Sequence, residues 1–109
     1  MYIISPRNGE TVSSPFTVRF GLKGMGVAPA GVQFANTGHH HLLVDVAQPP
    51  DMTAPLAVTP NIRHFGGGQT EAEITLPAGS HTLQLLLADY IHLPHDTPVM
   101  SEKITVTVK

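Results

Sequence analysis

The chain has 109 residues, a formal net charge of −2, and only 13% charged residues. This length fits one domain, residues 1–109, with a modest core, and the small acidic balance argues against nucleic acid or an anionic membrane surface as a partner. The chain has no cysteine and no apolar stretch long enough to span a bilayer, which excludes disulfides, thiolate metal ligands, cysteine nucleophiles and a transmembrane helix.

Ten glycines and ten prolines predict many turns, and no segment shows a sustained helical period. Apolar and polar residues instead alternate, as on a strand with one buried face: Phe16, Val18 and Phe20 alternate with Thr17 and Arg19. The clearest expected strands are residues 2–4, 16–22, 39–46, 71–76, 81–90 and 103–109. We therefore expect an all-β domain, an immunoglobulin-like antiparallel β-sandwich of about seven strands.

Three segments in the long connections between these strands are rich in glycine or proline. Residues 23–37 hold several glycines and join the second expected strand to the third. Residues 48–61 contain four prolines, Pro49 among them, and are expected to run along an edge rather than inside a sheet. Residues 63–70 contain three consecutive glycines and are expected to form a flexible loop. This loop lacks the strand–loop–helix context and the Gly-Lys-Ser/Thr ending of a phosphate loop.

Three consecutive histidines, His39, His40 and His41, lead directly into an apolar run. The run is internal and continues into a strand without a linker, so it is not a purification tag. Because strand side chains alternate between faces, His40 shares the apolar core face with Leu42. His39 and His41 are expected on the outer face.

The expected topology brings distant histidines together. In an immunoglobulin-like order, strand 39–46 begins at the same end of the sandwich at which its antiparallel neighbour, strand 81–90, finishes. The histidine triplet should therefore lie near Asp89, His92 and His95. The loop with His64 reaches the same end if it is the connection between the fourth and fifth strands of that order. His81 should lie at the opposite end.

Several segments resemble the family DUF4399, and together they cover nearly the whole chain. They are residues 20–31 (FGLKGMGVAPAG), 37–43 (TGHHHLL), 64–70 (HFGGGQT), 81–89 (HTLQLLLAD), 92–96 (HLPHD) and 101–106 (SEKITV). The resemblance implies a small exported bacterial domain, often periplasmic, with no agreed activity and no established site. No signal peptide precedes Tyr2, so we expect either a cytoplasmic protein or a chain that begins after a removed signal. The resemblance favours a periplasmic or secreted location.

The converging histidines predict a transition-metal site, with copper or zinc as the ion. The expected ligands are His39, His41, His92 and His95. Further candidates, as additional ligands or as partners that orient an imidazole, are His40, His64, Asp89, Asp96 and Met25. The alternative is that these histidines hydrogen-bond the long loops to one another, which is the more natural role for the inward-facing His40. For Met25, simple loop packing is the alternative.

Three functions compete on this evidence. The first is a periplasmic metal-binding module, with copper preferred, which could act with a periplasmic protein partner. The second is a non-catalytic module that binds a protein or glycan and uses its histidines structurally. The third is a metal-dependent enzyme, for which Asp89 or Glu102 would be the base. We assign no catalytic residue, and no serine has the surroundings of a hydrolase nucleophile.

Overall fold

The computed structural model describes residues 1–48, 50–57 and 59–109; of the proline-rich connection, Pro49 and Val58 lie outside the described residues. The described residues form nine strands and no helix, and hence no helix that is long and apolar enough to cross a membrane. The strands are β1 (Tyr2–Ser5), β2 (Thr11–Val12), β3 (Phe16–Gly21), β4 (Gly26–Val27), β5 (Thr37–Val44), β6 (Ile62–Phe65), β7 (Glu71–Ile74), β8 (Gly79–Ala88) and β9 (Ile104–Val108). The all-β prediction is confirmed.

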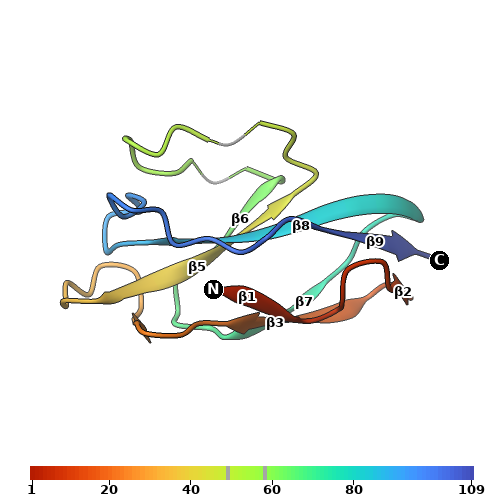
Figure 1. The fold of residues 1–109 in the computed structure, drawn as a ribbon, viewed down its shortest axis with the longest axis horizontal. Coiled ribbons are helices and arrows are strands. Elements are labelled where there is room, and N and C mark those ends of the chain that lie inside the picture. Colours follow the sequence, from red (N-terminus) through yellow and green to blue (C-terminus); the bar gives the residue numbers. More distant parts are fainter. Residues whose placement is uncertain (49, 58) are drawn as a thin grey trace.

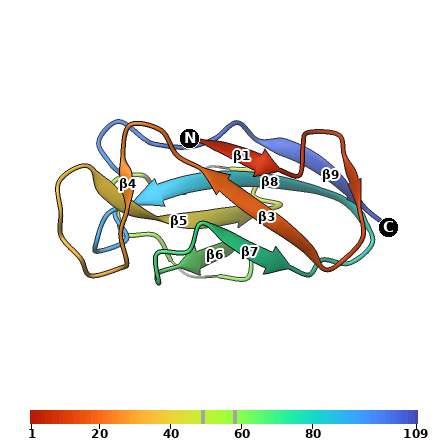
Figure 2. The ribbon, with the colours of Figure 1, turned by 90° about the horizontal axis from the view of Figure 1, so that it is seen from below.

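Two sheets lie face to face. The three-stranded sheet has the order β1-β3-β7, and the six-stranded sheet has the order β2-β9-β8-β5-β4, with β6 also paired to β5. Figure 1 shows the sheets one above the other, and Figure 2 shows β1, β3 and β7 as the nearer layer. The expected antiparallel pairing of the histidine strand with its long neighbour is present, because β5 pairs antiparallel with β8.

The main core lies between the sheets and follows from the alternation of each strand. Phe16, Val18 and Phe20 of β3 are buried, while the intervening Thr17 and Arg19 are exposed. These aromatic and aliphatic side chains pack against the inward residues of the other sheet. The buried residues that complete this core are Leu42, Val44, Ile74, Leu76, Leu83, Leu85, Val106 and Val108.

A second, smaller apolar cluster covers the other face of the six-stranded sheet. It contains Leu43, Leu56, Leu86 and Ala88, with Met52 among the side chains packed on it. In Figure 1 the connection between β5 and β6 lies over this face. The face that bears His39 and His41 was expected to be the outer one, but both side chains are 0% exposed. Alternation placed them on the correct face, where the rings of His64 and His92 pack against both.

The structure corrects the prediction for residues 63–70. They do not form one flexible loop, because Ile62–Phe65 is strand β6, which pairs antiparallel with β5. The short strands β2 and β4 were also not expected, and they pair parallel with β9 and β5 respectively. The described residues therefore contain nine strands where about seven were expected.

Candidate metal centre

Strand β5 supplies two neighbouring imidazoles from one face. His39 lies opposite Ala88 of β8, and His41 lies opposite Leu86 of β8 and His64 of β6. The close approach of β5 to β8 at this end depends on Gly38, because a Cβ atom there would lie 2.5 Å from the carbonyl oxygen of Ala88. The sheet thus carries His39, His41 and His64 on adjacent positions of one face.

The fourth imidazole comes from the loop after β8. His92 has a left-handed backbone, with φ 65°, which is uncommon outside glycine. Its N–H donates to the carbonyl oxygen of Asp89 at 3.0 Å, and its carbonyl oxygen accepts from the N–H of Leu56 at 2.7 Å. Oδ1 of Asp89 also accepts from the N–H groups of Ile91 and Leu93, at 3.0 Å each. The loop backbone on both sides of His92 is therefore held.

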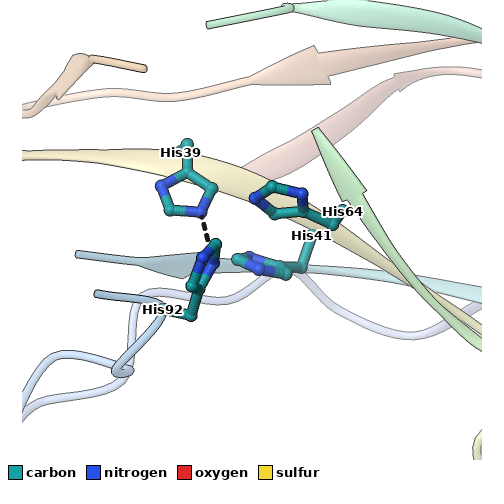
Figure 3. Close-up of side chains that lie close together, drawn as sticks. All are labelled: His39, His41, His64 and His92. Carbon is teal, nitrogen blue, oxygen red and sulfur yellow. Dashed lines mark hydrogen bonds between the residues drawn. The ribbon is translucent and has the colours of Figure 1, made fainter. Parts of the chain in front are cut away.

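The four rings face one another. Figure 3 shows His39, His41, His64 and His92 converging, with Nε2 of His39 3.0 Å from Nδ1 of His92. Each ring offers one nitrogen as a ligand atom, and these four nitrogens all lie within 4.8 Å of one another. A tetrahedral ion with bonds of about 2.0–2.1 Å needs ligand nitrogens roughly 3.3–3.4 Å apart. A small inward movement of the side chains would therefore complete a four-nitrogen site.

Burial favours the neutral form of three of these imidazoles, those of His39, His41 and His64. It lowers the pKa of His39 to about 4, aided by the nearby His92 and His64 and opposed by the charge of Asp89. Burial likewise lowers the pKa of His41 to about 3, with His39, His64 and His92 adding to the effect. The pKa of His64 is also lowered, first by burial and then by His92. Neutral imidazole is the form that binds metals, so at neutral pH these three rings need not lose a proton to do so.

Several buried nitrogens of the group have no protein partner. They are Nδ1 of His39, both ring nitrogens of His41 and Nε2 of His64. A buried polar atom without a partner costs about 1–3 kcal/mol of stability. No hydrogen bond from the surrounding protein offsets the free-energy cost of burying these nitrogens.

The remaining histidines lie elsewhere. His40 is buried in the main core, with its ring 4.8 Å from that of Phe20. Nε2 of His95 lies 3.4 Å from the carbonyl oxygen of Thr37, and His95 is not one of the four converging residues. His81 lies beyond the far end of β5, where Nδ1 is 2.7 Å from Oδ2 of Asp45 and Nε2 donates to the carbonyl oxygen of Pro77.

The structure thus brings together three of the four ligands expected from the sequence, His39, His41 and His92, and adds His64 instead of His95. Asp89 lies beside the group, where its side-chain Oδ1 accepts hydrogen bonds from two backbone N–H groups of the loop. Asp96 is exposed, and Met25 directly precedes β4. His64 points toward His41 because the next residue, Phe65, packs on Phe20 in the core, and adjacent strand residues face opposite sides.

Comparison with known proteins identifies a family and no function. The model of the family described as "Domain of unknown function (DUF4399)" matches residues 18–109. The chain therefore belongs to this family, as its histidine and glycine motifs indicate. No curated protein and no solved structure matches it.

Proposed function

We propose that this DUF4399 domain binds one transition-metal ion through His39, His41, His64 and His92. The observation that carries the proposal is the convergence of four imidazole nitrogens within 4.8 Å, from two strands and a loop. The lowered pKa values of His39, His41 and His64 and the unpaired nitrogens of these three rings add support. A purely structural role would be better served by hydrogen bonds, yet the one described among these four rings joins His39 to His92.

Copper is the ion that we propose first, and zinc is the second candidate. The donors are all imidazole nitrogens, which suit both metals. Copper stands at the top of the affinity order for divalent first-row ions at nitrogen sites. The exported character implied by the family supports a periplasmic or secreted metal-handling module.

Binding is favoured over catalysis by the makeup of the group. A catalytic zinc site typically has three protein ligands and leaves its fourth position to water or substrate. Here four imidazoles are available to fill a tetrahedral shell, and the group includes no carboxylate to act as a base. Glu102, one of the bases considered from the sequence, is exposed. We therefore propose no enzyme activity.

We also propose that residues 1–109 form one immunoglobulin-like domain. The order β1-β3-β7 corresponds to strands A, B and E of that fold, and β9-β8-β5 corresponds to strands G, F and C. Strands of both sheets contribute to one main core, whose buried residues extend along the chain from Phe16 to Val108. These correspondences support the assignment.

The test is metal analysis and titration of untagged protein and three single variants. Wild type should bind one ion of copper or zinc per chain. His64→Gln and His92→Asn remove partly exposed ligands, and asparagine tolerates the left-handed backbone at position 92. Each should weaken binding by more than the roughly 10–100-fold that the loss of an outer-shell partner costs. His95→Asn is the control and should bind like wild type.

Two outcomes would contradict the proposal. One is the absence of saturable binding of either metal at neutral pH, after which a protein- or glycan-binding module becomes the better account. The other is loss of binding in His95→Asn equal to that in His64→Gln. Circular dichroism of each variant separates a lost ligand from a lost fold.

A further inference from the structure

The charge of the site carries information about the ion. All four converging groups are imidazoles. Imidazole binds a metal as a neutral donor, so a bound ion keeps its full charge. Two of the four, His39 and His41, are 0% exposed, and Ala88 beside them is also fully buried. The cost of transferring an ion from water into such surroundings grows with the square of its charge. A divalent ion therefore meets a much larger cost here than a monovalent ion.

Divalent sites built from imidazoles usually offset this charge with an additional ligand. In zinc sites with three histidines, water occupies the fourth position, and the ion lowers the pKa of that water until hydroxide forms. In this structure His92 faces the three sheet-borne histidines and supplies a fourth nitrogen (Figure 3). A tetrahedral ion held by all four rings has no position left for hydroxide.

One carboxylate lies close to the group. Asp89 follows Ala88, the residue paired with His39, and its charge acts to raise the pKa of His39. Its Oδ1 is engaged by the N–H groups of Ile91 and Leu93, so it lies beside the group and is not part of it. This single negative charge balances a monovalent ion and leaves a divalent ion with one uncompensated positive charge.

We infer that the site selects copper in its monovalent, cuprous form over divalent copper and zinc. This inference depends on the metal-binding function proposed above and adds the oxidation state of the ion. Geometry supports it as well. Divalent copper prefers four ligands in a plane, whereas three of these rings come from one sheet face and the fourth comes from a loop. Cuprous ion has a filled d shell and imposes no such plane.

The test compares three ions on the same protein. Cuprous affinity is measured anaerobically, with ascorbate present, by competition with a chromogenic cuprous chelator. Divalent copper and zinc are titrated by calorimetry without reductant. Cuprous ion should bind at least about tenfold more tightly than divalent copper. Each factor of ten raises the midpoint potential of the bound divalent/cuprous copper couple by about 59 mV over that of free copper. Zinc should bind more weakly than cuprous ion.

Two variants test the charge argument directly. Asp89→Asn keeps the oxygen acceptor and removes the charge. Because the interaction energy scales with the charge of the ion, the fold loss in zinc affinity should be about the square of the fold loss in cuprous affinity. His92→Asp adds a carboxylate at a backbone conformation that aspartate tolerates, and it should shift the preference toward zinc.

The outcomes separate this inference from the function on which it rests. If zinc or divalent copper binds as tightly as cuprous ion, the inference is wrong and the metal-binding function stands. If Asp89→Asn weakens both ions by equal factors, the charge argument is wrong. If none of the three ions binds, the proposed function fails and the inference fails with it.

Discussion

At the scale of single residues, the backbone conformation of His92 depends on hydrogen bonds made by its neighbours. Its left-handed backbone costs free energy, and the bonds around it through Asp89 and Leu56 hold that conformation. The loop therefore presents Nδ1 of His92 to His39 before any ion arrives. Asp89 is a positioning residue in this arrangement, because it acts through the loop backbone.

We predict that Asp89→Ala weakens metal binding by about 10–100-fold, the range typical of lost outer-shell partners. Asp89→Asn keeps an oxygen that can accept from Ile91 and Leu93, so it should lose only the effect of the charge. Calorimetric titration of both variants checks the prediction. Equal affinities in the two variants would show that the backbone bonds of Asp89 do not position His92.

His40 is a different kind of histidine. It lies on the core face of β5, is 0% exposed, and has no protein partner for either ring nitrogen. Burial lowers its pKa to about 4, with His39 adding to the effect, so it is neutral at neutral pH. Its polar atoms weaken a core that is otherwise apolar.

We expect His40→Leu to raise the free energy of unfolding by about 1–3 kcal/mol, because it removes unpaired buried polar atoms from contact with Phe20. His40→Asn is the matched control and should not be stabilising, because it keeps unpaired polar atoms. Urea unfolding at neutral pH, with a chelator present, measures both. A less stable His40→Leu variant would mean that the imidazole contributes to the core.

Alternation alone was sufficient to place His40 on one face of the strand and His39 and His41 on the other. It could not predict that the second face is buried, because burial depends on the connection that carries Leu56 and packs over Leu43 and Leu86. The expected strand order did place His92 near His39, and the two rings are in contact. The left-handed backbone that fixes His92 leaves no signature in the sequence.

At the scale of elements, β6 shows where sequence patterns are weakest. Ile62–Phe65 has four residues and lies between Pro60 and a run of three glycines, so its neighbours indicate a loop. Its pairing with β5 is a long-range contact that the local sequence does not encode. The longer strands β3, β5 and β8 were predictable because their apolar residues repeat over more positions. Without β6, alternation could not place His64 beside His41, so His64 stood among the additional candidates.

The β5–β8 pair offers a test of how backbone spacing supports the site. Gly38→Ala would place a Cβ atom against the carbonyl oxygen of Ala88, next to His39. We predict a loss of about 1–3 kcal/mol in stability, as for other overpacked sites, together with weaker metal binding. Gly26→Ala is the control, since its Cβ would meet Thr37 at an ordinary 3.4 Å. Thermal unfolding and metal titration of both variants check this prediction. Equal stability and equal affinity in the two variants would contradict it.

At the scale of the whole molecule, acid should destabilise the metal-free protein. The pKa values of His39 and His40 are lowered to about 4 and that of His41 to about 3, so the unfolded chain takes up protons first as the pH falls below about 6.5. Each of these three residues contributes a loss of about 2 kcal/mol between pH 6.5 and 5.

His81 acts in the opposite direction, whereas its partner Asp45 loses its contribution in acid, as the buried histidines do, but only at lower pH. The hydrogen bond to Asp45 raises the pKa of His81, so its contribution is fully present below about 6.5 and is lost as the pH rises through the raised value. The pKa of Asp45 is lowered by its bonds to His81 and Thr82 despite some burial, so its contribution is lost only as the pH falls through that lowered value. The pair is therefore most stabilising in mildly acidic solution.

We predict that the melting temperature of the chelated protein falls steeply between pH 6.5 and 5, and that His81→Asn costs more stability at pH 5.5 than at pH 8. Thermal unfolding across this pH range measures both effects. A melting temperature that stays level from pH 7 to pH 5 would mean that the buried histidines do not resist protonation.

The central claim is that one ion sits among His39, His41, His64 and His92. Anomalous diffraction at the copper absorption edge, from crystals of the copper-loaded protein, tests it most directly. We predict one strong anomalous peak between the four rings, with metal–nitrogen distances of about 2.0 Å. A peak at His95, Asp96 or His81 with none between the four rings would contradict the claim.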